Sequence, residues 1–326
     1  MSDIVIASDC NYLHLVSICA VSLFETNSSE SLHFHLLSNG IDSADIKNLQ
    51  TIVEGYRGKL SVYPIENLRE RLMTDVPETI SLTSYARLFA GSILPANLDK
   101  VLYIDCDIIF NGSIRDLFNT DLGNCLVGGI LDPLISRTYK KEIKIPMSEP
   151  YINAGVLIIP LNRWRSEGME QKFVDFLVAN RGKVHHHDQG IINAVCAGRK
   201  KILPPQFNVM SNSLCYPWKD LYKINTPFYD QEEYKKGISS PAIIHFTGAI
   251  HGRPWIVGCT HPYANKFLQF KAKTAYKDIP LKPNNQSAAL HRLEGILYRL
   301  LPFSLFKRYM PVSYTHLRAH ETRSNL

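Results

Sequence analysis

The stretch Lys100-Val-Leu-Tyr-Ile-Asp105-Cys-Asp107-Ile-Ile109 joins an apolar run to two carboxylates that stand one residue apart. Residues i and i+2 of an extended chain project to the same face, so Asp105 and Asp107 can converge on one cation. Carboxylate oxygens suit hard divalent ions, which here means Mg²⁺ or Mn²⁺. An Asp-x-Asp pair alone is a weak signal, because many surface strands end this way by chance. The apolar run directly before it favours a metal site at the end of a buried strand.

A repeating order of apolar strand, loop and helix surrounds this stretch. Ile4-Val-Ile-Ala7 ends at Ser8-Asp9 and is followed by a helical pattern from about residue 12 to residue 26. The alternation predicts further strands at 33–37, 59–63 and 101–104 and helices at 42–54 and 83–94. Repeated βα units predict an α/β fold with a mostly parallel central sheet, in which ligands gather at the carboxyl ends of the strands. Asp9 and Asp105 both stand at such ends.

The second half of the chain continues this pattern less regularly. It predicts strands at 125–131, 155–159 and 241–244 and helices at 164–179 and 188–197. Residues 203–241 are rich in Pro, Asn, Tyr and Ser, which predicts a loop-rich lobe over the sheet rather than a separate domain. Residues 277–287 have the composition of a linker. We therefore expect one domain over residues 1–280.

The composition is near the average for soluble globular proteins, with 45% hydrophobic and 20% charged residues among 326. This excludes a disordered, collagen-like or membrane-spanning chain. The seven cysteines are scattered and show no CxxC spacing, which argues against a disulfide framework or a zinc ribbon and favours a reducing compartment. With neither a bilayer-length apolar stretch nor a secretory signal after Met1, the sequence predicts a cytoplasmic protein.

The basic charge is concentrated towards the carboxyl terminus. Residues 263–310 hold nine Lys and Arg against two Asp and Glu, and within 288–311 leucines recur at helical spacing. Because a basic amphipathic segment can bind an anionic membrane surface, we expect peripheral contact with the inner face of the cytoplasmic membrane. The alternative is a terminal helix packed on its own domain. Residues 312–326 resemble a translated vector-derived tail and are excluded from functional reasoning.

Three further segments carry polar side chains suited to a charged ligand. Asp9-Cys10-Asn11 follows the first strand, where an acid and an amide can hydrogen-bond a base or ribose, although helix capping is their ordinary role. Arg87 lies on a predicted helix before the Asp-x-Asp stretch and suits a phosphate or an acidic partner, although a solvated or ion-paired side chain is the ordinary interpretation. His245 follows the strand-like residues 241–244 and is a reasonable third ligand for a borderline ion such as Mn²⁺.

In their order and spacing these segments resemble glycosyltransferase family 8, the retaining enzymes that include bacterial lipopolysaccharide galactosyl- and glucosyltransferases and, more distantly, glycogenin. The likeness covers about residues 3–280. It rests on the segments 4–12, 85–88, 101–107, 151–157, 187–190 and 245–248 with 253–255. The resemblance implies a single Rossmann-like nucleotide-sugar-binding core of the GT-A type, followed by the basic helical tail.

The resemblance also implies the participants in the reaction. UDP-galactose or UDP-glucose is the expected donor, and the lipopolysaccharide core or another lipid-linked glycan is the expected acceptor; no nucleic acid partner is expected. The expected ligands of Mn²⁺ or Mg²⁺ are Asp105, Asp107 and His245. The expected donor-binding residues are Asp9 and Asn11 at the uridine, with Arg87, Cys106, Asn153, Gly248 and Arg253. The expected catalytic residues are Asp132, Asp188 and Gln189.

The implied chemistry is transfer with retention at the anomeric carbon. A divalent metal would neutralise charge on the departing diphosphate. Retention follows either from an enzyme nucleophile and a second displacement or from front-face attack, in which UDP helps to deprotonate the acceptor, and the sequence leaves both routes open. Gln189 is a poor nucleophile, so we expect it to orient or stabilise the sugar. We expect Asp188 to bind sugar hydroxyls rather than to act covalently.

Two departures from the family pattern affect this interpretation. The closing motif has two extra residues and carries Arg253 where the family usually has Lys, and Gly190 stands where many bacterial members have an acid. Two other functions are compatible with parts of the sequence. A haloacid-dehalogenase-like phosphatase also places Asp-x-Asp after an apolar strand, and a non-catalytic protein could bind the nucleotide sugar without turnover.

Overall fold

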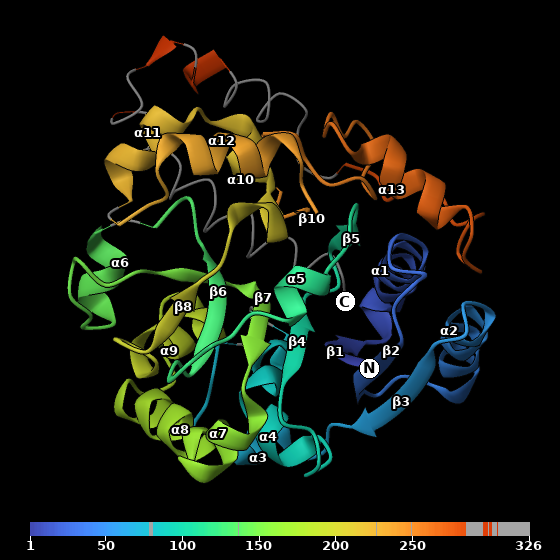
Figure 1. Cartoon of the computed structure of the whole chain (residues 1–326), viewed down its shortest axis with the longest axis horizontal. Coiled ribbons are helices and arrows are strands. Elements are labelled where there is room, and N and C mark those ends of the chain that lie inside the picture. Colours follow the sequence, from blue (N-terminus) through green and yellow to red (C-terminus); the bar gives the residue numbers. More distant parts are fainter. Residues whose placement is uncertain are drawn as a thin grey trace.

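The computed structural model describes residues 1–284 except 78–80, 136, 226 and 249, and beyond residue 284 only residues 296–298, 300, 301 and 305. A seven-stranded sheet in the order β3-β2-β1-β4-β7-β6-β8 forms its centre (Figure 1). Its strands are β1 (Ser2–Asp9), β2 (Leu32–Asn39), β3 (Lys59–Pro64), β4 (Val101–Ile104), β6 (Val127–Leu131), β7 (Ile152–Ile159) and β8 (Lys200–Ile202). The predicted α/β fold is confirmed.

Most neighbouring strands of this sheet are parallel. Strand β1 pairs in parallel with β2 and β4, β2 with β3, and β6 with β8. Strand β7 is the exception, because it runs antiparallel to both β4 and β6. Every residue of β4 and β7 is buried, as expected for strands covered on both faces. Such mostly apolar runs predict a buried strand but carry no information about its direction.

Helices cover the sheet and both of its ends. They are α1 (Leu13–Thr26), α2 (Ser43–Gly55), α3 (Leu68–Arg71), α4 (Ala90–Ile93), α5 (Arg115–Phe118), α6 (Arg137–Glu142), α7 (Leu161–Ser166), α8 (Met169–Ala179), α9 (His187–Val195), α10 (Ser211–Cys215), α11 (Trp218–Ile224), α12 (Gln231–Ser239) and α13 (Ala264–Lys271). The described residues also form the 3-10 segments η1 (Cys10–Tyr12), η2 (Leu82–Phe89) and η3 (Pro205–Phe207). Figure 1 shows α10, α11 and α12 together at one end of the sheet and α3, α4, α7 and α8 at the other.

Three predicted elements differ from the structure. The helix expected at 83–94 is mainly the 3-10 segment η2, with only a short α-helical end. The helix expected at 164–179 is divided into α7 and α8 by Gly168, whose φ of +61° lies in the left-handed region that interrupts a helix. The lobe at 203–241 contains the three short helices α10, α11 and α12 among its loops.

A second, three-stranded sheet brings distant parts of the chain together. Its order is β5-β10-β9, formed by β5 (Ile108–Phe110), β10 (Ile243–His245) and β9 (Val209–Met210). Strand β10 runs antiparallel to β5, with His245 opposite Ile108. This register places His245 beside the residue that directly follows Asp107, although the two lie in distant parts of the sequence.

The carboxyl-terminal part of the described chain stays attached to this body. The backbone of Lys282 bonds to Trp255 and Val257, so residues after the predicted domain end at 280 still contact the fold. In the predicted tail 288–311, Tyr298 lies with its ring centroid 5.0 Å from that of Tyr216, and Ile296 is 51% exposed. Most other residues of that segment and the predicted tail 312–326 lie outside the described residues.

The sequence analysis also considered the cysteines and possible membrane-spanning segments. All seven cysteines lie in the described part of the chain and are free thiols. Among the described helices, none has the length and apolar character required to cross a bilayer.

Candidate active site

Two carboxylates and an imidazole converge where β4, β5 and β10 meet. Asp105 and Asp107 follow β4, and His245 ends β10. The Nε2 atom of His245 lies 3.0 Å from Oδ1 of Asp107 and 3.9 Å from Oδ2 of Asp105. One potential ligand atom from each residue falls within 4.8 Å of the others. Two carboxylates with one imidazole form a donor set that fits a divalent ion such as Mn²⁺ or Mg²⁺.

The cluster is partly open to solvent on the side of its acids. The side chains of Asp105 and Asp107 are 27% and 21% exposed, whereas that of His245 is 4% exposed. Burial alone would raise the pKa of Asp107, but the adjacent His245, followed by Arg253, holds it below its usual value. Burial would likewise lower the pKa of His245, and Asp107 more than offsets this effect. The cluster therefore concentrates negative charge beside a fixed imidazole.

The imidazole of His245 is held by a residue that the sequence analysis did not identify. Buried Asn208 places its Oδ1 3.0 Å from Nδ1 of His245 and donates through Nδ2 to Oδ1 of Asn153 at 2.9 Å. A carbonyl acceptor at Nδ1 directs Nε2 of the ring towards Asp105 and Asp107. Such contacts orient the ligands of metal sites. Asn208 lies in the Pro- and Asn-rich lobe, and no motif or residue spacing in the sequence indicates that it contacts His245.

Gly155 leaves the space in which these side chains meet. A Cβ atom at Gly155 would overlap Cε1 of His245 and would lie 2.9 Å from Oδ2 of Asp105. The backbone oxygen of Gly155 also accepts a 2.8 Å hydrogen bond from the amide of Asp105. Because Gly155 of β7 has no side chain, His245 and Asp105 have the space to approach each other.

Arg87 is buried, and its guanidinium binds protein groups. Its Nη2 lies 2.7 Å from Oδ1 of Asp105, and its Nε lies 3.0 Å from Oδ2 of Asp188. It also donates to the backbone oxygens of Ser84 and Ala154. Burial would lower the pKa of Arg87, but Asp105 and Asp188 raise it above its usual value. Arg87 thus fixes two of the predicted site acids, in agreement with the ion-paired alternative.

A hydrogen-bonded amide and acid network adjoins the cluster. Asp132 follows β6, Asn153 lies in β7 and Gln189 lies on α9. Oδ2 of Asp132 accepts from Nδ2 of Asn153 at 3.2 Å and from Nε2 of Gln189 at 3.1 Å. Oε1 of Gln189 accepts from Asn153 at 3.1 Å and from the amide of Ala154 at 3.0 Å. Through Asn153 and Asn208 this network is continuous with His245.

Asp9 lies at the carboxyl end of β1 and caps the segment η1. Its Oδ1 accepts from the amide of Asn11 at 3.0 Å, and its Oδ2 accepts from the hydroxyls of Ser81 at 3.0 Å and Thr83 at 3.4 Å. The side chain of Asn11 is exposed. Burial, and then the charges of Asp107 and Asp105, raise the pKa of the Cys106 thiol well above its usual value.

Gly248 and Arg253 complete the set of predicted residues. Gly248 has a φ of +95°, a backbone conformation that favours glycine. A Cβ atom there would lie 3.8 Å from Nε of Arg253, so the turn and the guanidinium are close. Arg253 is half-buried, lies 5.7 Å from the ring centroid of Trp255, and lowers the pKa of Asp107. The structure therefore places a cation near Asp107 despite the altered motif.

Local backbone geometry explains the departure at Gly190. A Cβ atom at Gly190 would overlap the carbonyl oxygen of His185. The two intervening histidines, His186 and His187, both have φ in the left-handed region, with values of 57° and 54°. His186 also lies at the site, with its Nδ1 atom 3.1 Å from the hydroxyl of Tyr151 and 3.4 Å from Nε2 of Gln189. This turn has no room for a carboxylate at position 190.

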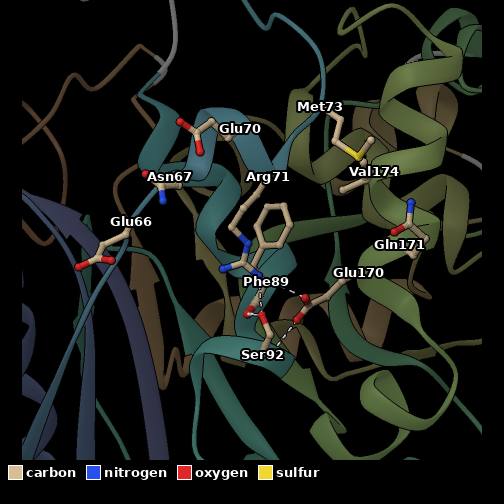
Figure 2. A pocket seen from close by; sticks show the side chains of 10 residues that line it. All are labelled: Glu66, Asn67, Glu70, Arg71, Met73, Phe89, Ser92, Glu170, Gln171 and Val174. Carbon is tan, nitrogen blue, oxygen red and sulfur yellow. Dashed lines mark hydrogen bonds and ion pairs between the residues drawn. The ribbon is translucent and has the colours of Figure 1, made fainter.

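A separate hollow lies between η2, α3 and α8 and contains none of the predicted site residues (Figure 2). Its volume is about 730 Å³. The guanidinium of Arg71 projects into it over the ring of Phe89, with 4.2 Å to the centroid, and bonds to Glu170 at 3.3 Å. The cation of this hollow is thus already paired with a carboxylate.

The α/β core is of the GT-A type found in glycosyltransferases. The sequence model of "Glycosyl transferase family 8" matches residues 3–257, and the chain belongs to this family. The expected family is therefore confirmed, and the phosphatase alternative is excluded. The matched range includes every predicted site residue.

Individual relatives agree with this assignment. The lipopolysaccharide 1,2-glucosyltransferase of Escherichia coli K12 is 24% identical over 275 residues, which are 83% of this chain and 77% of that protein. A Haemophilus influenzae protein is 28% identical over 209 residues, and the chain spans 62% of its length. The crystal structure of the galactosyltransferase LgtC with donor and acceptor sugar analogues has a TM-score of 0.73 and 26% identity, and the match covers 84% of this chain and 96% of LgtC.

Proposed function

We propose that the protein transfers galactose or glucose from a UDP-sugar to a glycan acceptor with retention, using a divalent ion bound by Asp105, Asp107 and His245. The convergence of these three side chains within 4.8 Å at the carboxyl end of the sheet carries the proposal. Ligands bind at this end of open α/β sheets. The adjoining amide and acid network offers hydroxyl-binding groups of the kind that a sugar requires.

Positive charge around the cluster suits a departing diphosphate. When bound, Mn²⁺ or Mg²⁺ would supply electrostatic stabilisation of the charge on the leaving group. Arg253 would bind the diphosphate together with the metal ion, because its planar guanidinium can donate hydrogen bonds to two phosphate oxygens. Gly248 would allow close approach of the backbone, and Asp9 and Asn11 would bind the uridine. Cys106 would line the floor between the uridine and the metal.

The residues around the donor sugar have distinct roles in this proposal. Asp132, Asn153 and Gln189 would bind and orient the sugar, because their amides and carboxylate already share one network. Asp188 is 7% exposed and paired with Arg87, which favours a binding role over covalent attack. We therefore favour front-face displacement: the bond between the anomeric carbon and UDP breaks, the acceptor oxygen bonds to that carbon, and its proton passes to the departing phosphate.

The acceptor is proposed from the relatives and the charge distribution. The E. coli relative is a lipopolysaccharide glucosyltransferase, and LgtC is a galactosyltransferase solved with donor and acceptor sugar analogues. We propose the lipopolysaccharide core or another lipid-linked glycan as acceptor. The basic segment 288–311 would bring the domain of residues 1–280 to the inner face of the cytoplasmic membrane, while residues 312–326 would be dispensable.

Turnover with defined donors tests this function. The full chain is incubated with UDP-galactose or UDP-glucose and Mn²⁺, and UDP release is followed with and without lipid-linked oligosaccharide acceptors. We expect release with one of the two donors, increased by acceptor and abolished by excess chelator. Tight UDP binding without transfer or donor hydrolysis would instead support the non-catalytic alternative.

A further inference from the structure

A second group of metal-ligating side chains lies at the opposite end of the same sheet. Asp3 is the second residue of β1, and His33 lies opposite it on β2 with His35 two residues further along. Because each strand residue rises about 3.3 Å, Asp3 is separated from Asp9 by about 20 Å along β1. This amino-end cluster, Asp3 with His33 and His35, is therefore distinct from the candidate active site.

The three side chains project to one face and share one centre. His33 and His35 are two positions apart on a strand, so both rings lie on the same side of the sheet. Nε2 of His35 lies 2.9 Å from Oδ1 of Asp3, and Nδ1 of His33 lies 3.4 Å from the same oxygen. Ligand atoms of a tetrahedral zinc ion with bonds of about 2.0 Å lie about 3.3 Å apart, which agrees with these separations.

Each imidazole is fixed through its remaining nitrogen by a hydroxyl of the neighbouring strand β3. Nε2 of His33 lies 2.8 Å from the hydroxyl oxygen of Ser61, and Nδ1 of His35 lies 3.1 Å from that of Tyr63. Hydrogen bonds of this kind orient the ligating histidines of metal sites. The nitrogens that face Asp3 are consequently the ones available for an ion.

Burial and charge at this cluster also suit a metal. His35 is fully buried and His33 nearly so, while the side chain of Asp3 keeps 14% exposure, which leaves one open side for a water ligand. Asp3 supplies the carboxylate ligand of the set beside the two imidazole nitrogens.

We propose that Asp3, His33 and His35 bind one Zn²⁺, or a closely similar borderline divalent ion, that joins β1 to β2 at the amino end of the sheet. Two imidazoles with one carboxylate favour such an ion over Mg²⁺. The site is structural in this proposal. It is independent of the transferase reaction, because it lies at the end of the sheet away from the candidate active site.

The test uses the full chain carrying both Asp105→Asn and Asp107→Asn. These changes remove the carboxylate ligands of the candidate active site, so that zinc binding at the amino-end cluster can be measured. After removal of metals with a chelator, Zn²⁺ is titrated by calorimetry and Co²⁺ by its visible absorption spectrum. We expect one Zn²⁺ per chain, a rise in melting temperature with zinc, and a tetrahedral Co²⁺ spectrum. No binding by this folded protein would overturn the proposal.

Single changes in the same background locate the ion. His33→Gln and, as a second variant that preserves side-chain shape, Asp3→Asn should each remove the zinc-dependent rise in melting temperature. Ser61→Ala should weaken binding about 10- to 100-fold, because it frees one imidazole. His185→Gln, which changes an exposed histidine paired with Glu142, is the matched control and should bind zinc normally. Normal binding by His33→Gln would show that the ion lies elsewhere.

Discussion

The two ends of the central sheet carry the same types of metal ligand in different surroundings. At the carboxyl end, Asp105 and Asp107 are partly exposed and lie beside the cations Arg87 and Arg253. At the amino end, the imidazole His35 is fully buried among strand neighbours. The comparison indicates that ligand type alone does not define a catalytic site. Asp105 and Asp107 are more exposed than Asp3, and arginine guanidiniums, which can bind phosphate, lie near them.

The two clusters also differ in how the chain assembles them. His33 and His35 belong to one strand, and Asp3 lies on the strand beside it. Asp107 and His245 come from segments far apart in the sequence and meet only through the small sheet of β5, β9 and β10. We expect changes at the carboxyl end to alter catalysis and changes at the amino end to alter stability. The predictions below test that division.

The largest expected effect follows from removing one acid of the carboxyl-end cluster. Asp105→Asn and Asp107→Asn should each reduce transfer by about 1000-fold or more, because an amide neither carries the charge nor binds the ion well. Transfer rates at saturating donor and Mn²⁺ measure this effect. Asp116→Asn, at an exposed acid of α5, is the matched control and should retain full activity. Full activity in either site variant would contradict the metal assignment.

A single methyl group at Gly155 should have the next largest effect. Gly155→Ala places a Cβ atom against His245 and Asp105, so we expect about 100-fold slower transfer, with about 1–3 kcal/mol lower stability from overpacking. Gly55→Ala is the control, because no atom lies within 4 Å of a Cβ atom at that position. Rates and denaturant unfolding are measured together. An active Gly155→Ala protein would show that the cluster tolerates displacement.

Asn208 should influence metal affinity more than the chemical step. Asn208→Ala removes the acceptor that orients His245, and loss of such a contact weakens metal binding about 10- to 100-fold. We expect the Mn²⁺ concentration for half-maximal activity to rise by this factor, while much of the rate returns at saturating Mn²⁺. Asn119→Ala, on the surface after α5, serves as control. An unchanged Mn²⁺ concentration for half-maximal activity would show that Asn208 does not influence metal binding.

Substitutions of Arg253, in the altered closing motif, should have a smaller effect, which increases from Lys to Ala. Arg253→Lys keeps the charge but loses the planar fork, so we expect the KM for the UDP-sugar to rise by about tenfold or less. Arg253→Ala should raise it further. Initial rates over a range of donor concentrations provide both values. Equal KM values for the wild-type protein and both variants would exclude a diphosphate contact by Arg253.

The smallest effect on transfer is expected at the amino end. His33→Gln should leave the rate at ordinary assay temperature unchanged, because the amino-end cluster lies about 20 Å along β1 from Asp9. It should nevertheless remove the stabilisation by zinc. Activity assays and thermal unfolding of the same preparation compare the two properties. A large loss of activity without loss of stability would contradict the division between the two ends.

The parts of the fold that followed from sequence are those encoded by local pattern. Strand β4 begins and ends as predicted, because the apolar run stops at the charged Asp105. The direction of β7 was not predictable, since a strand buried on both faces has the same apolar pattern in either direction. The 3-10 form of η2 likewise has nearly the same side-chain spacing as the predicted helix.

The site residues that belong to sequence motifs could be predicted. Those that reach the site only through tertiary packing could not. Asp105 and His245 were identified from strand ends, and the structure brings them together. Asn208 was missed because its contact with His245 depends on tertiary packing. The role of Gly155 required the positions of the side chains around it, and the internal pairing of Arg87 could not be distinguished from a phosphate contact in the sequence.

Binding of Mn²⁺ measured by electron paramagnetic resonance, with and without UDP, tests the central claim most directly. The wild-type protein should bind Mn²⁺ at the carboxyl end more tightly when UDP is present, Asp107→Asn should lose this UDP-dependent binding, and His33→Gln should retain it. Undiminished UDP-dependent Mn²⁺ binding by a folded Asp107→Asn protein would contradict the account.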